Sequence, residues 1–225
     1  MIKTVFVDID DTLLDFDKCA KNSIIAACKK YNIKYTSEIF DTFKKINTQL
    51  WLDIEKGNLT KSELHKVRWK LIFNELKIDA DGIAFENMFF NNLSVSADPV
   101  DGASEMLKYL YSKYIICAAT NAAYNQQVKR LKMCNMYNYI KYIFASEKLG
   151  FQKPTKEFFD SCFSALGNIN KNETIIIGDS ISADIIGGIE YGIKTCWFNK
   201  NAITTPNSLK IDYVVNNLCE IKNIL

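Results

Sequence analysis

The residues best suited to chemistry in this sequence are acidic groups that come shortly after short apolar runs. Asp8 and Asp10 follow the run Lys3–Val7, while Asp179 and Asp184 follow another run much further along the chain. Because they stand two residues apart at the end of an extended segment, the side chains of Asp8 and Asp10 point to one side. Crowded carboxylates repel one another, and a divalent cation is one way to keep them ionised. We therefore expect a cation near these groups.

Three further polar residues occupy comparable places. Thr120 and Asn121 follow the apolar run Tyr114–Ala119, and Lys153 precedes Pro154. Proline suits the first turn of a helix, which predicts that Lys153 lies at a helix N-terminus, itself an anion site. A set of oxygen ligands without histidine or cysteine suits Mg²⁺, which also takes substrate phosphate oxygens. Together these features indicate a phosphate substrate.

The elements that must position these residues alternate along the chain. Short apolar runs, bounded by polar residues or glycine, are typical of buried parallel strands. They are Lys3–Val7, Tyr114–Ala119, Lys141–Ala145, Thr174–Ile177, Lys194–Trp197 and Tyr213–Val215. Helical periodicity covers Gly102–Tyr111, Tyr124–Met133, Thr155–Leu166 and Ser182–Tyr191. This alternation predicts an α/β fold with a doubly wound, Rossmann-like parallel sheet, which binds ligands at the carboxyl ends of its strands.

One long stretch interrupts the alternation and shows only helical periodicity. Four helices are predicted near residues 17–31, 37–53, 60–77 and 80–93. Thr60 and Glu63 have the spacing of a capping box, and the segment ends before Asp98-Pro99. We therefore expect a core domain of residues 1–15 and 95–225, with an inserted all-helical cap domain over residues 16–94.

Composition excludes several classes of protein. The 225 residues carry a net charge of +2, and only two of the 28 basic residues are arginine, which argues against a nucleic-acid partner. No apolar run approaches the roughly 18 residues of a membrane span. A single histidine, His65, excludes a multi-histidine zinc site and argues against a serine–histidine triad. We expect His65 to be an ordinary helix residue, although a substrate contact is an alternative.

Cysteine usage bears on the cellular compartment. The count is odd, no two cysteines form a Cys-x-x-Cys pair, and acidic residues interrupt the N-terminal apolar run before it resembles a signal peptide. The cysteines are Cys19, Cys28, Cys117, Cys134, Cys162, Cys196 and Cys219. We expect them to be reduced, mostly buried thiols of a cytoplasmic protein.

Each candidate also has an ordinary structural interpretation. An Asp-x-Asp pair after a strand is often a turn or a helix cap, and Thr120 alone would suggest a cap. Their occurrence together, each at the same edge of a different strand–helix unit, favours a common site.

The complete set resembles the four motifs of the haloacid dehalogenase superfamily, and the match covers essentially the whole chain. The motifs are Asp8-x-Asp10-x-Thr12, Thr120, Lys153-Pro154 and Gly178-Asp179-Ser180-x-x-x-Asp184. The helical insert resembles the C1 cap of that superfamily.

The resemblance implies a role for each motif residue. Asp8 would be the nucleophile that forms an aspartyl-phosphate, and Asp10 the general acid and then the base. Mg²⁺ would be held by Asp8, the backbone carbonyl of Asp10, and Asp179. Thr120, Asn121 and Lys153 would bind the phosphoryl oxygens. Thr12 would support the site, and Asp184 would orient Lys153 or a metal-bound water.

Asp10 discriminates among the chemistries of this superfamily. A halide leaves without a proton, whereas an alkoxide needs one, so an acid at this position favours phosphoryl transfer over dehalogenation. Asp11-Thr12 differs from the Gly-Val of phosphoglucomutase-like members, which makes a mutase a weaker option. A phosphonatase would need a particular cap lysine that the sequence does not single out.

A closer resemblance, to bacterial pyrimidine 5′-nucleotidases of the house-cleaning type, comes from the cap and the C-terminal part. It lies in Asn47-x-x-Leu50-Trp51, Gly57-x-Leu59-Thr60, Arg68, Asp184-Ile-x-Gly187-Gly188 and Thr195-Cys196-Trp197-x-Asn199. The chain departs from those relatives at Ala122, where they usually have glycine. The residues of the cap that are candidates for substrate contact are Phe16, Trp51, Lys56 and Arg68. The alternative for Trp51 is a place in the hydrophobic core, and the alternative for Arg68 is a solvated position on a helix.

The sequence thus predicts a Mg²⁺-dependent phosphatase for a small phosphomonoester, with a pyrimidine nucleoside 5′-monophosphate as the first choice. The alternatives are a phosphatase for sugar or other metabolite phosphates, and a non-catalytic, phosphate-binding regulatory protein. No membrane or nucleic-acid partner is expected. The sequence leaves the oligomeric state open, whether a monomer or a small homo-oligomer.

Overall fold

The computed structural model describes residues 1–167, 169–205 and 208–225. The chain forms two units. The larger consists of residues 1–16 with 97–225, and the smaller of residues 17–96.

The larger unit contains a sheet of six parallel strands in the order β3-β2-β1-β4-β5-β6. The strands are β1 (Thr4–Val7), β2 (Ile115–Thr120), β3 (Tyr142–Ala145), β4 (Thr174–Gly178), β5 (Lys194–Phe198) and β6 (Tyr213–Val215). From β1 the chain winds outward to β3, then returns to β4 on the other side of β1. The predicted doubly wound fold is therefore confirmed, with its switch point between β1 and β4, where such sheets bind ligands.

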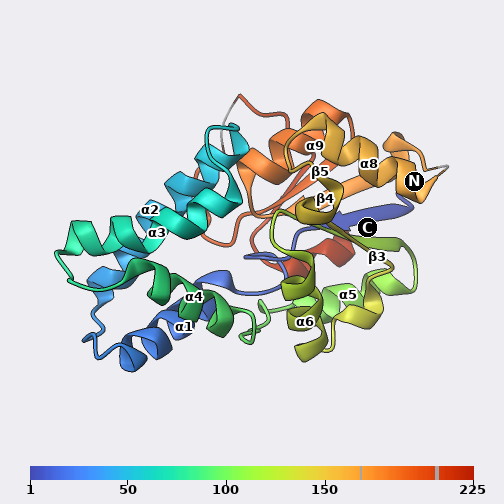
Figure 1. Cartoon of the computed structure of the whole chain (residues 1–225). Helices are drawn as coiled ribbons and strands as arrows, with labels where there is room; N and C mark the ends of the chain where they lie inside the picture. The colour runs from blue at the N-terminus through green and yellow to red at the C-terminus, as the bar shows by residue number, and fades with distance from the viewer. Residues whose placement is uncertain (168, 206–207) are drawn as a thin grey trace. The chain divides into compact units, whose positions relative to one another are not determined.

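Helices cover both faces of this sheet (Figure 1). They include α5 (Ala103–Tyr111), α6 (Tyr124–Met133), α7 (Ser146–Leu149), α8 (Lys156–Leu166) and α9 (Gly187–Tyr191). A π-helical segment spans Ile181–Ile186, and short 3₁₀ segments span Tyr137–Tyr139, Lys171–Glu173 and Leu218–Asn223. Successive side chains of β1 point to opposite faces of the sheet. Val5 and Val7 pack in one hydrophobic cluster with residues of α5, and Phe6 packs in another with residues of α8.

The smaller unit consists of helices, as the periodicity predicts. They are α1, which begins in the larger unit (Phe16–Lys30), α2 (Ser37–Glu55), α3 (Lys61–Leu76) and α4 (Gly82–Leu93). The predicted capping box is present: the side chain of Thr60 accepts from the N–H of Glu63, whose carboxylate accepts from the N–H of Thr60. Inside the unit, Trp69 packs against the rings of Phe43 and Phe85.

Two helix predictions of the larger unit need correction. The helix expected over Thr155–Leu166 begins at Lys156, with Thr155 as its N-cap, so Pro154 is not in its first turn and Lys153 is not at its N-terminus. The helix expected over Ser182–Tyr191 is divided into the π-helical segment and α9.

None of the cysteines, all of which lie in the described residues, forms a disulfide, and five of the seven are buried. Burial raises the pKa of Cys28 to about 11 and that of Cys117 to about 12, which keeps these thiols protonated. Within the described residues, no helix is long and apolar enough to cross a membrane.

Candidate active site

The side chain of Lys153 joins three segments at the carboxyl edge of the sheet. Its Nζ lies 2.6 Å from Oδ1 of Asp8, 2.6 Å from Oδ1 of Asp184 and 2.6 Å from the carbonyl oxygen of Ala119. Lys153 is 2% exposed, and Asp184 is fully buried. An ammonium group has three protons to donate, and these three acceptors match them. The lysine is therefore held at the ends of β1, β2 and β4 at once.

Burial and charge act in opposite directions on these groups. Burial alone would lower the pKa of Lys153, but the charges of Asp184 and Asp8 outweigh it and raise the pKa, so the ammonium stays charged. Burial raises the pKa of Asp8 to about 8, against the opposing effect of Lys153. Burial, followed by the charge of Asp8, holds the pKa of Asp179 well above its usual range. The positive charge of Lys153 alone therefore does not balance the negative charges of the crowded carboxylates.

A cation fits this excess of negative charge. Carboxylate oxygens of Asp8, Asp179 and Asp184 lie within 4.8 Å of one another, and all three donors are hard oxygens. Asp184 already accepts from Lys153 and from the backbone N–H of Ser180, which favours Asp8 and Asp179 as direct ligands. The cluster thus contains Asp8 and Asp179, two of the metal ligands expected from the sequence, together with Asp184.

Asp179 is held by the residues around it. The hydroxyl of Thr12 donates to Oδ1 of Asp179 at 3.1 Å and accepts from its N–H at 3.1 Å. The indole N–H of Trp197 donates to the carbonyl oxygen of Asp179 at 2.9 Å. Through these two hydrogen bonds Thr12, which is fully buried, links the loop after β1 to the loop after β4.

The structure changes the expectation for Asn121. Its side-chain amide donates to the carbonyl of Lys153 at 2.9 Å, and its side-chain oxygen accepts from the N–H of Lys153 at 2.9 Å. The amide of Asn121 therefore fixes the backbone of the lysine instead of pointing both polar atoms at a phosphate. Thr120 is buried and accepts from the N–H of Ala122, which is half-buried. It is not the cap of α6, which is Ala123.

Sequence reasoning missed two residues of the site. Gln127 and Arg130, both on α6, contact the carboxylate of Asp10, the arginine at 2.5 Å. Each is at most 1% exposed. The scarcity of arginine was the available signal: this chain uses lysine for nearly all its cations, and its two arginines are both buried and both paired with a carboxylate. Arginine suits such fixed, planar pairing better than lysine does.

The cap candidates differ in exposure. Phe16 and Trp51 are half-buried, and Lys56 is exposed. Trp51 packs against the small apolar cluster of Leu50, Ile54 and Leu64.

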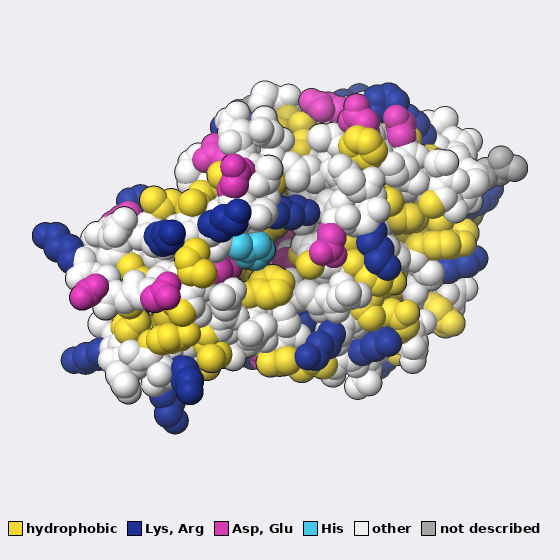
Figure 2. Space-filling view, viewed as in Figure 1, with side chains coloured by type: hydrophobic (Ala, Val, Ile, Leu, Met, Phe, Trp, Pro, Cys, Tyr) yellow, Lys and Arg dark blue, Asp and Glu magenta, His cyan; other side chains and the backbone are white. Residues whose placement is uncertain are grey.

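Arg68 is not solvated, because its guanidinium group is buried and bonded within the helical unit. It is 3% exposed and donates to both carboxylate oxygens of Glu86 and, at 2.8 Å, to the side chain of Asn47. His65 reaches the surface (Figure 2), with its Nδ1 2.8 Å from Oε1 of Glu86. The helical unit therefore has a buried ionic cluster of its own.

Comparison with known proteins establishes the family. A family model described as haloacid dehalogenase-like hydrolase matches residues 5–198, most of the chain. The chain belongs to this family. The putative HAD-hydrolase YfnB of Bacillus subtilis is 32% identical over 99% of this chain and 95% of its own length.

Two further relatives have a named activity. The pyrimidine 5′-nucleotidase PynA of Streptococcus pneumoniae is 30% identical over 99% of this chain and 97% of its own length. The pyrimidine 5′-nucleotidase YjjG of Escherichia coli is 27% identical over 98% and 96%. Among solved structures, that of YfnB bound to magnesium has a TM-score of 0.94 and covers 100% of this chain and 98% of that one.

Proposed function

We propose that this hydrolase is a Mg²⁺-dependent phosphatase that cleaves small phosphomonoesters through a phosphorylated Asp8. The observation that carries the proposal is the contact of buried Lys153 with Asp8, inside a group of carboxylates that lacks enough positive charge. Such a site suits a reaction in which a carboxylate must approach an anionic phosphoryl group. When bound by Asp8, Asp179 and the backbone carbonyl of Asp10, Mg²⁺ would neutralise that negative charge.

In the first step, an oxygen of Asp8 forms a bond to phosphorus while the bond from phosphorus to the ester oxygen breaks. The ester oxygen takes a proton from Asp10, and the alcohol departs. Lys153 offsets charge on Asp8 and the non-bridging oxygens, and Thr120 donates its hydroxyl to one of them. Asn121 keeps the backbone of Lys153 in place.

In the second step, water attacks the phosphorus of the aspartyl-phosphate. Asp10, now ionised, takes the proton from water as the new bond forms. The bond between phosphorus and Asp8 breaks, which restores the carboxylate and releases inorganic phosphate. A proton donor and acceptor at one position is worth about 10²–10⁴-fold in rate.

For the leaving group, we propose a pyrimidine nucleoside 5′-monophosphate. The two relatives named pyrimidine 5′-nucleotidases, which match nearly the whole chain, support this choice. The residues that bind the phosphoryl group are the same for any monoester, so discrimination has to come from other residues. We assign it to the helical unit, where Trp51 is the aromatic candidate. We assign no substrate contact to Arg68, because its guanidinium group already donates to Glu86 and Asn47.

The decisive experiment is a screen of purified protein with and without Mg²⁺. We expect p-nitrophenyl phosphate turnover that requires the metal, and faster hydrolysis of uridine or thymidine 5′-monophosphate than of purine nucleotides or hexose phosphates. Faster turnover of sugar phosphates would overturn the choice of substrate and leave the phosphatase proposal intact. A protein that binds phosphate without hydrolysing any monoester would support the regulatory alternative.

Replacing Trp51 tests the role of the helical unit. Trp51→Ala should raise KM for the nucleotide and leave turnover of p-nitrophenyl phosphate nearly unchanged. Equal effects on the two substrates would count against a contact with the base.

A further inference from the structure

The carboxylate of Asp10 is held from one side by two neighbouring side chains of α6. Nη1 of Arg130 donates to Oδ1 of Asp10 at 2.5 Å, and Nε2 of Gln127 donates to Oδ2 at 2.5 Å. Both oxygens therefore have a defined donor. The Asp10 side chain is 27% exposed, whereas that of Arg130 is 1% exposed. A partly solvated carboxylate is thus held by groups whose own rotamers are fixed by burial.

The two donors are also joined to each other. Nη1 of Arg130 donates to Oε1 of Gln127 at 3.1 Å, which closes a ring of three side chains. The spacing of three residues puts Gln127 and Arg130 on the same face of α6. Nε2 of Gln127 also lies 3.3 Å from the hydroxyl oxygen of Thr120, at the end of β2. The ring therefore connects Asp10 to a second residue of the site.

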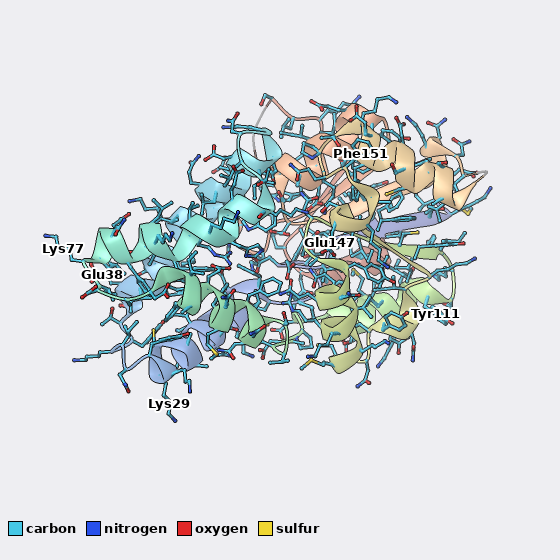
Figure 3. All side chains as sticks on the ribbon, viewed as in Figure 1. Lys29, Glu38, Lys77, Tyr111, Glu147 and Phe151 are labelled. Carbon is cyan, nitrogen blue, oxygen red and sulfur yellow. The ribbon has the colours of Figure 1, made fainter. Side chains whose placement is uncertain are left out.

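The helix that carries this ring is anchored at its first residue. The carboxylate of Glu147, which is labelled in Figure 3 and belongs to α7, accepts from the backbone N–H of Tyr124 at 2.9 Å. An acidic group at a helix N-terminus satisfies a free N–H and complements the helix dipole. Together with the buried side chain of Leu131, this contact fixes where α6 presents Gln127 and Arg130.

We propose that Gln127 and Arg130 are positioning residues that orient the carboxylate of Asp10 for proton transfer. This inference rests on the proposed phosphatase function, in which Asp10 gives a proton to the leaving oxygen and later takes one from water. Proton transfer requires the carboxylate to be within hydrogen-bond reach of two different oxygen atoms in turn, so free rotation of its side chain would slow both steps. If these contacts served only the stability of the fold, the effect of replacing Gln127 or Arg130 would be the same whether or not Asp10 could transfer a proton.

The test compares the same substitutions in two backgrounds. Gln127→Met and Arg130→Met are made in the wild type and in Asp10→Asn, and kcat and KM are measured for p-nitrophenyl phosphate and uridine 5′-monophosphate. In the wild type we expect kcat to fall about tenfold to a hundredfold, with KM changed less than about twofold. In Asp10→Asn the same substitutions should lower kcat by less than about twofold, because the group they orient is already gone.

Lys129→Met is the matched control, since it removes an exposed cation from the adjacent position of α6 and should leave kcat unchanged. Arg130→Lys should recover part of the lost kcat. If Arg130→Met does not fold, Gln127→Met and Arg130→Lys carry the comparison, with thermal unfolding measured for each. A crystal structure of Gln127→Met should show the Asp10 carboxylate rotated away from its wild-type position.

The outcomes separate the two proposals. A wild-type protein that hydrolyses no phosphomonoester with Mg²⁺ overturns the function and this inference together. An active wild type in which the α6 substitutions lower kcat equally in both backgrounds, or change KM alone, overturns this inference only.

Discussion

Lys153 is the side chain on which the geometry of the site depends most. It is a fully buried cation whose three acceptors come from different segments of the chain. Its backbone is in turn fixed by the amide of Asn121. Because burying a charge costs free energy unless it is paired, the surrounding structure has to keep all of these partners in place. The position of Asp8 follows from that requirement.

We predict that Asp8→Asn abolishes nearly all turnover, by about 10⁴-fold or more, because an amide cannot form the phosphorylated intermediate. The amide is close in size to the carboxylate, so the fold should remain. Steady-state kinetics and circular dichroism would check both parts. Asp101→Asn, at an exposed position of the same unit, is the control. A variant that keeps substantial activity would rule out Asp8 as nucleophile.

At the scale of elements, the turn after β4 shows how a short segment sets the site. The π-helical segment Ile181–Ile186 begins after Asp179 and Ser180, just beyond the strand, and carries Asp184 back toward the end of the strand. A β-carbon on Gly178 would lie 2.2 Å from Oδ2 and 2.4 Å from Cγ of Asp184. Glycine is therefore required here by close approach. Single-turn π segments are often found at functional sites, in keeping with this position.

From that contact we predict that Gly178→Ala displaces Asp184 and removes one acceptor from Lys153. Activity should fall about a hundredfold, since small displacements of catalytic groups have effects of this size. Overpacking should also destabilise the fold by about 1–3 kcal/mol. Kinetics and urea unfolding would measure the two effects.

Gly192→Ala is the matched control for this prediction. Gly192 has φ of +82°, and among the described residues no atom from elsewhere in the chain lies within 4 Å of the place that a β-carbon would take. The substitution therefore strains the backbone without touching the site. It should cost roughly 1–2 kcal/mol of stability and leave kcat unchanged. If both glycine variants lose activity equally, close approach at Gly178 is not the cause.

At the scale of the whole molecule, each of the two units contains a buried arginine that is paired with a carboxylate. In the larger unit the pair is Arg130 with Asp10, and in the smaller it is Arg68 with Glu86. Glu86 is 2% exposed, and its partner lies over the ring of Phe89. Burial raises the pKa of Glu86, but hydrogen bonds from His65 and Arg68 and their charges outweigh it, so the pKa is lowered.

This shift predicts how stability depends on pH. The unfolded chain binds a proton at Glu86 more readily than the folded one, so stability contributed by the ionised group is present above the ordinary pKa of 4.5 and is lost as pH falls through the lowered value. Glu86→Gln should destabilise the protein by about 3–5 kcal/mol at neutral pH, because it leaves Arg68 buried without its carboxylate. The difference from wild type should shrink in acid.

Urea unfolding at pH 7 and at pH 3.5 would measure this difference. Glu38→Gln, at an exposed position of α2 labelled in Figure 3, is the control and should change stability by less than about 0.5 kcal/mol. A Glu86→Gln difference that is the same at both pH values would contradict the assignment to ionisation of Glu86.

Metal binding should also be visible as a property of the whole molecule. A ligand that binds only the folded state stabilises it, and the crowded Asp8 and Asp179 carboxylates favour a divalent cation. We predict that Mg²⁺ raises Tm and restores activity after EDTA treatment, while Ca²⁺ restores activity poorly because its coordination is looser. Asp179→Asn should lose both effects. Full activity after exhaustive chelation would contradict the metal assignment.

The sequence by itself determined the parallel α/β architecture and the edge of the sheet on which to look for chemistry. Both follow from local signals: strand and helix periodicities are set by neighbouring residues, and parallel strands bring their carboxyl ends to one edge. Asp8, Asp10, Thr120, Lys153, Asp179 and Asp184 all follow such strand ends or the loops beside them, so their gathering was predictable.

Only the tertiary structure decided which of these groups bind one another. Asp10 and Arg130 are 120 residues apart in sequence, and Thr12 and Asp179 are 167 apart, so no periodicity relates them. Arg68 looked like a surface or substrate residue because a helix pattern does not reveal a carboxylate on the next helix. Asn121 was predicted to bind phosphate because the sequence does not show that its side chain is bonded to the backbone of Lys153. Pairing between distant segments depends on how helices and loops pack against the sheet, and local sequence carries no record of that packing.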